Sequence, residues 1–305
     1  MTVARVLAVA STLIVLATLS ACGSPGATAG APRVSLEKLT RQTLGTLPGM
    51  ASLEVEQTPI DDSDPTDRSD PDLWTLDIAV EMSEDATPDQ IASAADATQM
   101  FANDHVGSAR WIAHLTVGAI HPVPGEDRTA PAAVQIEVYP ATRRSAAGDV
   151  RDALAVKSIP NVQNVAIASK QILVQVASAA DLSVAIDRLR PLPLWSDGGV
   201  LQVDEGRIQL TDVPDRVTFA QIHSIIAAGV AYPDADFALQ SSGQSPELYV
   251  NHVTVKQARA LTTSLTAPTL AHVGADGFVL EFDIRASNAN QTVDSHGTFG
   301  QPDAD

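Results

Sequence analysis

Hydrophobic and polar positions follow two different periods along this chain, and the two alternate in a regular order. After Thr87 and Pro88, a typical helix start, apolar residues recur at helical spacing up to Phe101. Residues 134–138 instead alternate strictly between apolar and polar, which is typical of a strand with one buried face. Between residues 36 and 284 the order helix–strand–strand recurs six times, which predicts that the chain contains an internal repeat.

The boundaries of the predicted elements follow from these periods and from the turns between them. Asp204-Glu205-Gly206 and Gly274-Ala275-Asp276-Gly277 provide the Gly and Asp residues that tight hairpin turns require. We expect helices over residues 36–44, 88–101, 146–156, 181–189, 218–229 and 255–265. We expect strands over residues 51–57, 74–82, 111–117, 134–139, 162–168, 172–177, 200–203, 207–210, 236–240, 248–252, 270–273 and 278–284.

Six helix–strand–strand units predict an α+β fold. Paired, they would form two-layer α/β sandwiches with antiparallel-rich sheets, similar to the split βαβ arrangement of ferredoxin-like modules. The pairs are expected at residues 35–140, 145–211 and 217–285. The polar, aromatic-poor residues 286–305 are expected to be a disordered tail.

One segment resembles a known envelope module. Ile159-Pro160-Asn161-Val162-Gln163-Asn164-Val165 leaves a predicted helix and enters a strand with apolar residues three positions apart. A strand–helix–strand pattern follows it. This segment resembles the BON domains of bacterial envelope proteins, and the resemblance implies a module that binds a component of the envelope.

The beginning of the chain carries a secretion pattern. Residues 6–19 form an apolar run that is too short to span a bilayer, and Leu19-Ser20-Ala21-Cys22 closes it. This pattern resembles the lipobox of bacterial lipoprotein precursors. The resemblance implies that residues 1–21 are a signal peptide and that Cys22 becomes the diacylglyceryl-modified first residue. Residues 22–34 are then a flexible tether to the extracytoplasmic face of the cell membrane.

Composition narrows the classes of partner. The chain has 305 residues, 45% of them hydrophobic and only 4% aromatic, and its formal net charge is −18. Cleavage before Cys22 would remove a single charge, that of Arg5, and leave the mature chain more negative still. Nucleic acids require clustered cations, so we expect no nucleic-acid partner. A polybasic contact with anionic lipid is disfavoured for the same reason, which leaves the lipid itself as the membrane anchor.

Residues 61–72 form an acidic loop interrupted by prolines and are the first candidate for a ligand site. Asp62, Asp64 and Asp67 offer oxygen atoms of the kind that calcium prefers. The spacing does not follow the EF-hand, because a loop starting at Asp62 has Asp67 where glycine is required and Leu73 where glutamate is required. A solvated loop that protects a sheet edge explains the same residues.

Catalytic signatures are weak in this sequence. The seven histidines form no HExxH pair, and the single cysteine is assigned to the lipid. No G-x-S-x-G, P-loop or GxGxxG motif occurs, so we expect no cofactor and no enzymatic activity. A wall hydrolase with paired carboxylates stays open, because such pairs meet only in the fold.

Trp195, in the rigid segment Pro191-Leu192-Pro193-Leu194-Trp195, is a candidate anchor for a partner. It would equally serve as a plug between two packed modules. The sequence therefore predicts a non-catalytic, lipid-anchored protein that binds an envelope protein or a wall polymer. The alternative is a small-molecule-binding lipoprotein that serves a transporter or sensor.

Overall fold

The computed structural model divides the chain into two units, Met1–Val34 and Ser35–Asp305. Its described residues all belong to the second unit. They are residues 36–59, 74–105, 110–118, 121–122, 129–130, 132–139, 145–168, 171–190, 192, 199–213, 215–242, 245–288 and 291–301.

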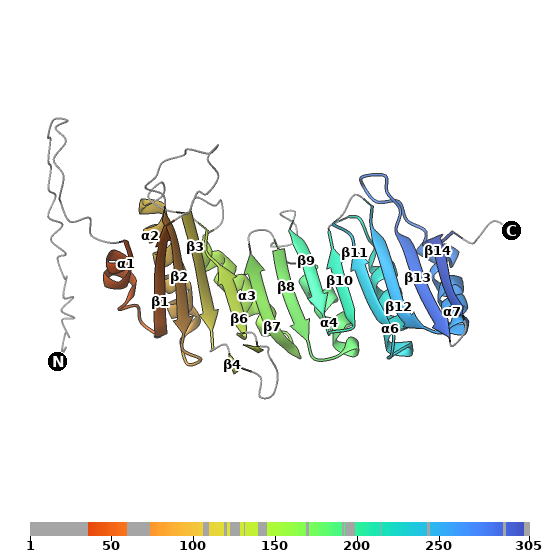
Figure 1. The fold of residues 1–305 in the computed structure, drawn as a ribbon, viewed down its shortest axis with the longest axis horizontal. Coiled ribbons are helices and arrows are strands. Elements are labelled where there is room, and N and C mark those ends of the chain that lie inside the picture. Colours follow the sequence, from red (N-terminus) through yellow and green to blue (C-terminus); the bar gives the residue numbers. More distant parts are fainter. Residues whose placement is uncertain are drawn as a thin grey trace, which may run out of the picture. The chain divides into compact units, whose positions relative to one another are not determined.

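The described elements follow the predicted recurrence of one helix and two strands (Figure 1). The helices are α1 (Leu36–Leu44), α2 (Pro88–Asp104), α3 (Ala146–Lys157), α4 (Ala179–Leu189), α6 (Phe219–Ala231) and α7 (Val255–Leu265). The first six strands of the main sheet are β1 (Met50–Pro59), β2 (Trp74–Met82), β3 (Arg110–Val117), β6 (Val134–Glu137), β7 (Val162–Ala168) and β8 (Gln171–Val176). The other six are β9 (Val200–Asp204), β10 (Ile208–Asp212), β11 (Asp236–Gln240), β12 (Glu247–Val253), β13 (Glu281–Asn288) and β14 (Gln291–Thr298). A separate two-stranded sheet, β4 (His121–Pro122) and β5 (Thr129–Ala130), lies between β3 and β6 in the chain, and a 3₁₀ turn, Pro268–Leu270, follows α7.

Three of the helices begin with the same local sequence, Thr-x-x-Gln. At α6, Thr218 Oγ1 accepts a hydrogen bond from the Gln221 backbone N–H, and the Gln221 side chain accepts one from the Thr218 backbone N–H. Thr87 with Gln90 caps α2 in the same way, and Thr254 with Gln257 caps α7. This capping box satisfies two backbone N–H groups at each helix start, which explains why the helices begin at these residues.

The twelve main strands form one continuous sheet in chain order, β1-β2-β3-β6-β7-β8-β9-β10-β11-β12-β13-β14. The two strands of each unit pair as an antiparallel hairpin, as β9 and β10 do. Strands joined across a helix pair in parallel, as β10 and β11 do across α6. Six antiparallel pairings therefore alternate with five parallel ones.

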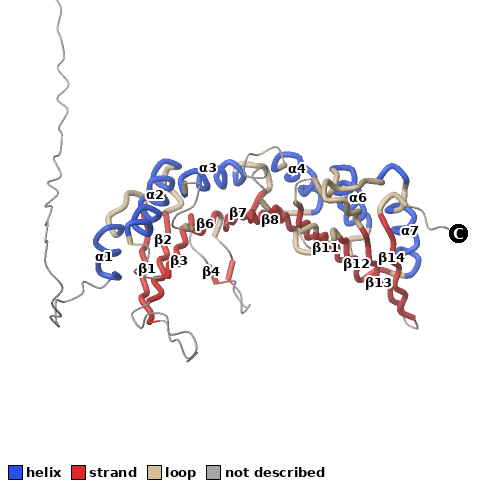
Figure 2. The backbone as a smooth tube through the Cα atoms, turned by 90° about the horizontal axis from the view of Figure 1, so that it is seen from above, coloured by secondary structure: helices blue, strands red, loops and turns tan. Residues whose placement is uncertain are grey.

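The helices lie against one face of this sheet, and the other face carries none of the described helices (Figure 2). Strand alternation produces the core, since every second side chain points toward the helices. In β2, Leu76, Ile78 and Val80 are buried against them, whereas Asp77 and Ala79 lie on the other face. The same alternation extends through the sheet as far as Phe282 and Ile284 in β13.

The α+β class is confirmed, but the ferredoxin-like pairing of units is not. In a ferredoxin-like module another strand lies between the two that flank a helix. Here the strands that flank each helix from α2 to α7 are direct neighbours, as β8 and β9 are across α4. The predicted modules would also end between β6 and β7 and between β10 and β11. Instead, backbone hydrogen bonds join each of these two strand pairs in parallel.

The predicted end of the chain is wrong in two respects. Residues 270–273 form no strand, and the last hairpin consists of β13 and β14 instead. Residues 286–288 and 291–298, expected in a disordered tail, therefore contribute to the sheet. β14 has the sequence Gln-Thr-Val-Asp-Ser-His-Gly-Thr and forms the last strand of the sheet. With few apolar side chains it has no alternating pattern by which a sequence analysis would recognise it.

We predict that Phe299→Ala destabilises the protein, although Phe299 lies in the segment that sequence alone suggests is disordered. Its side chain is 2% exposed and contacts Phe282 edge-to-face, with 6.0 Å between ring centroids. Loss of the ring should lower the free energy of unfolding by about 3–5 kcal/mol, measured by urea denaturation. The control is Phe278→Ala, at a side chain that is 43% exposed. Equal stability of the two variants would contradict the packing of Phe299.

Candidate functional site

The larger candidate site is the uncovered face of the sheet. The strand register aligns one row of side chains on this face, because residues directly opposite each other in neighbouring strands share a face. From β3 to β11 the row contains no charged side chain. Its members are Thr116, Gln135, Ala166, Leu173, Gln202, Thr211 and Gln240.

Amide side chains dominate the middle of this face. The Asn164 and Gln175 amides are hydrogen-bonded at 2.7 Å, and Gln171 Nε2 donates to Gln202 Oε1 at 3.4 Å. A hollow of about 540 Å³ lies beside them and is lined by Ala168, Gln171, Val200, Gln202, Thr211 and Gln240, among others. These amides offer hydrogen-bond donors and acceptors without charge, whereas His114 of β3 and Glu137 of β6 lie opposite each other beside the row.

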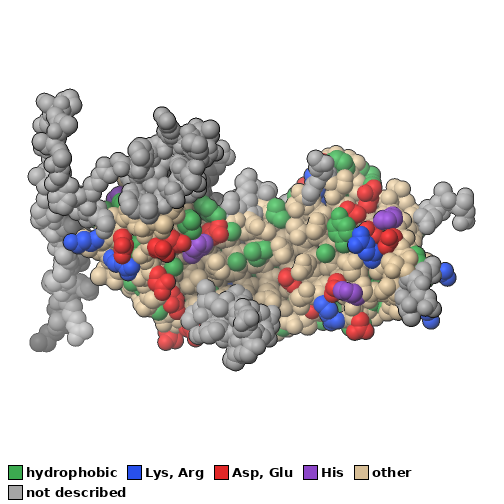
Figure 3. Space-filling model, viewed as in Figure 1, with side chains coloured by type: hydrophobic (Ala, Val, Ile, Leu, Met, Phe, Trp, Pro, Cys, Tyr) green, Lys and Arg blue, Asp and Glu red, His purple; other side chains and the backbone are tan. Residues whose placement is uncertain are grey.

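Acidic side chains lie at both ends of this uncharged row (Figure 3). On β1 and β2 they are Glu54, Glu56, Asp77 and Glu81, and on β12 and β13 they are Glu247, Glu281 and Asp283. The uncharged row therefore ends in carboxylates, Glu81 on one side and Glu247 with Glu281 on the other.

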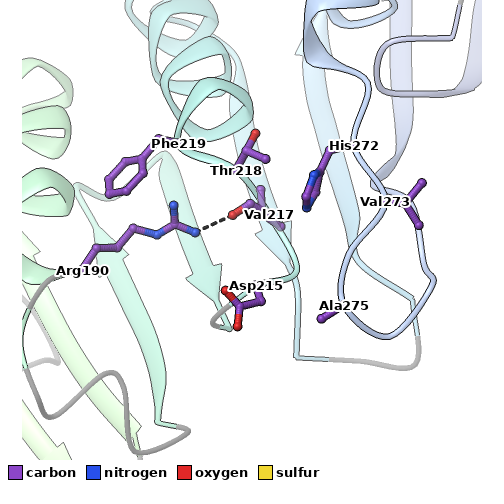
Figure 4. A pocket seen from close by; sticks show the side chains of 8 residues that line it. All are labelled: Arg190, Asp215, Val217, Thr218, Phe219, His272, Val273 and Ala275. Atoms are coloured by element: carbon purple, nitrogen blue, oxygen red, sulfur yellow. Dashed lines mark hydrogen bonds between the residues drawn. The ribbon is translucent and has the colours of Figure 1, made fainter.

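A second candidate is a cavity of about 660 Å³ at the start of α6 (Figure 4). Arg190, at the end of α4, lies on one side, and Val273 and Ala275, from the loop after the 3₁₀ turn, lie on the other. Phe219 and Val273 contribute exposed apolar surface, being 43% and 60% exposed. His272 and Asp215 add titratable groups to the lining.

Arg190 organises the base of this cavity. Its Nε donates to Asp212 Oδ2 at 3.0 Å. Its Nη2 donates to the carbonyl oxygen of Val217, and Figure 4 shows this second bond. The guanidinium carbon lies 4.3 Å from the centre of the Phe219 ring, a cation–π contact. One side chain thus links α4, β10 and the start of α6.

The partner of Arg190, Asp212, is fully buried. Burial raises the pKa of Asp212 from 3.8 to about 7, because water no longer solvates the charged form, and the charge of Arg190 opposes this effect. Asp212 Oδ1 is buried without a hydrogen-bond partner among the described atoms.

The far wall of the cavity consists of two turns held together by polar contacts. Arg216 Nε lies 2.6 Å from Asp276 Oδ2, and the Ala275 backbone N–H donates to the Asp215 carbonyl oxygen at 3.3 Å. Asp215 has a φ of +66°, in the left-handed region that a residue with a side chain seldom adopts. These contacts fix the cavity wall, but within the described chain they place no nucleophile beside a general base.

Most of the sequence-predicted site residues lie outside the described residues. This is true of Leu19, Ser20, Ala21 and Cys22, of the calcium candidates Asp62, Asp64 and Asp67, and of Trp195. Their predicted roles stay predictions. Where the structure is described, no group of three or more His, Cys, Asp or Glu side chains is arranged to hold a metal ion.

Both candidate surfaces were missed by the analysis of the sequence. The amides of the uncovered face have no motif, and their alignment depends on the pairing of strands that are far apart in the chain. Asp212 and Arg190 are 22 positions apart with no recognisable spacing. The sequence does contain one signal for the uncovered face. In the strands between residues 135 and 240 that alternate apolar and polar residues, the polar residue is often glutamine.

No protein-family model matches this chain, and neither the curated proteins nor the solved structures contain a match. The resemblances to lipoprotein precursors and to BON domains therefore stay predictions. No helix among the described residues is long and apolar enough to cross a membrane.

The buried carboxyl of Asp212 predicts a pH dependence of stability. Between about pH 4 and pH 7 the folded protein keeps a proton on Asp212 that the unfolded chain has lost. The free energy of unfolding should therefore fall as pH rises through this range, by up to about 1.4 kcal/mol per pH unit from this group.

Asp212→Asn cannot ionise and should remove this contribution, so its unfolding free energy should vary less between pH 4 and pH 7. Urea denaturation at several pH values measures the slope. The matched control is Asp234→Asn, at an exposed position, which should keep the wild-type slope. An unchanged slope in Asp212→Asn would show that Asp212 ionises normally in the folded protein.

Proposed function

We propose that this chain is a lipid-anchored, non-catalytic protein of the bacterial cell envelope that binds an envelope protein or a wall polymer. The lipobox at Leu19-Ser20-Ala21-Cys22 supports the anchor at the extracytoplasmic face of the membrane. The resemblance of residues 159–165 to BON domains supports an envelope-binding role. In the structure these residues run from the end of α3 into β7.

The observation that carries the proposal is the uncovered face of the sheet. A sheet of twelve strands with helices on one side presents a wide surface made of side chains from every unit. The middle of this face carries Gln202, Thr211 and Gln240, side chains that form hydrogen bonds but do not exchange protons near neutral pH. This chemistry is suited to recognition by hydrogen bonds.

The anchor is tested by Cys22→Ala in cells that process lipoproteins. We expect the wild-type protein to partition into detergent and to carry the mass of a lipid, and we expect Cys22→Ala to do neither. Detergent phase separation and mass spectrometry provide the measurements, with Ser24→Ala as the matched control. A Cys22→Ala protein that keeps the mass and membrane association of the wild type would overturn the proposal.

The cavity beside Arg190 favours a second candidate, a protein that binds a small molecule for a transporter or sensor. Its volume of about 660 Å³ lies within the usual range of small-ligand sites. A bound metabolite should raise the Tm of the protein, and His272→Ala should reduce this increase because His272 lines the cavity. A thermal-shift screen without any stabilising compound would count against this candidate.

A further inference from the structure

The acidic borders of the uncovered face contain two pairs of like charges that folding does not explain. Glu56 and Asp77 lie directly opposite each other in the antiparallel pair β1–β2. Glu247 and Glu281 lie directly opposite each other in the parallel pair β12–β13. Like charges at such positions repel one another and destabilise a sheet.

Arg41, the cation that lines the hollow at the first pair, is hydrogen-bonded to other groups. Arg41 lines the same hollow as Glu54, Glu56 and Asp77, but its guanidinium donates to the carbonyl oxygens of Leu53 and Val55. Arg41 Nε also lies 3.1 Å from Glu37. Because Glu54, Glu56 and Asp77 outnumber Arg41, this border keeps a negative excess.

The second border is also acidic after its own contacts are considered. His296 Nδ1 lies 3.7 Å from Asp283, and Arg285 Nε lies 3.9 Å from Asp294. Glu247 accepts a hydrogen bond from the Tyr249 hydroxyl, which is neutral, and Glu281 lies opposite Glu247 across the strand pair. Two carboxylates again face solvent side by side.

The sheet order sets the distance between the two borders. Eight strand intervals separate β2 from β12. At about 4.8 Å per interval, the borders lie about 40 Å apart along the sheet. The uncharged row from Thr116 to Gln240 occupies the space between them.

This charge pattern discriminates between possible occupants. A second copy of the chain placed face to face would bring carboxylates of its own against these borders, and an anionic wall polymer would be repelled for the same reason. A partner with cations at both borders would relieve the two like-charge pairs.

We infer that the occupant of the uncovered face is a protein with two basic patches about 40 Å apart and hydrogen-bonding side chains between them. This inference rests on the proposed function and specifies the partner. Each basic patch contacts one acidic border, and hydrogen-bonding side chains contact the amides between them. Complementary charges of this kind fix the register of a partner and accelerate its association.

The test is photo-crosslinking of the full-length, membrane-anchored protein in cells. Benzoylphenylalanine replaces Gln202, at the middle of the face, and a second version carries it at Val184, an exposed position on α4. We expect a single protein adduct from position 202 and none from position 184. Combining position 202 with Asp77→Lys and Glu281→Lys should reduce the adduct about tenfold, because each substitution places a cation opposite a basic patch.

The matched control combines position 202 with Asp104→Lys and Asp187→Lys, which change the net charge equally but lie on helices α2 and α4. This control should keep the adduct. Equal loss in both charge variants, or an adduct with the mass of two copies, would overturn the inference. An adduct that muramidase digests would overturn the inference but leave the proposed function intact. A folded, anchored protein with no adduct at position 202 would overturn the uncovered face as the binding surface, and with it the proposed function.

Discussion

Each helix–strand–strand unit depends on its neighbour, because a hairpin alone leaves both of its outer strand edges without hydrogen-bond partners. The second strand of one unit is completed only by the first strand of the next, as β10 is by β11. Two parallel strands must begin at the same end of the sheet. The helix between them is long enough to carry the chain back to that end. The continuity of the backbone hydrogen bonds across five such junctions is the constraint on which the rest of the structure depends.

One consequence is that all the connecting helices pack on the same face. Their apolar side chains and those of alternate strand positions form a single core, from Leu44 in α1 to Phe299 after β14. The opposite positions of every strand are then left without a covering layer. The amides and carboxylates at those positions keep that face in contact with solvent, or with a partner, at little cost in free energy.

Polar side chains satisfy backbone groups at the edge of the sheet and connect neighbouring units. At the first edge Arg41 donates to the carbonyl oxygens of Leu53 and Val55, which blocks the addition of another strand at these positions. At the junction of the fourth and fifth units the hydrogen bond from Arg190 to Asp212 connects α4 to β10, and Arg190 also contacts Val217 and Phe219. Through Val217 and Phe219, Arg190 links the fourth unit to the fifth and shapes the base of the cavity beside α6.

Element type and order were predictable from the sequence because they depend on local properties. The helical spacing after Thr87, the alternation of Val134, Ile136 and Val138, and the Gly and Asp residues of the turns each act over a few positions. β14 was missed because it is polar on an edge, where no core imposes a pattern. The lipobox prediction likewise rests on residues adjacent in sequence. Strand order, the row of uncharged side chains, the two like-charge pairs and the contact of Arg190 with Asp212 depend on residues that are distant in the chain. Only the tertiary structure decided them, because the register of each strand is set by packing against its neighbours and the helix above it.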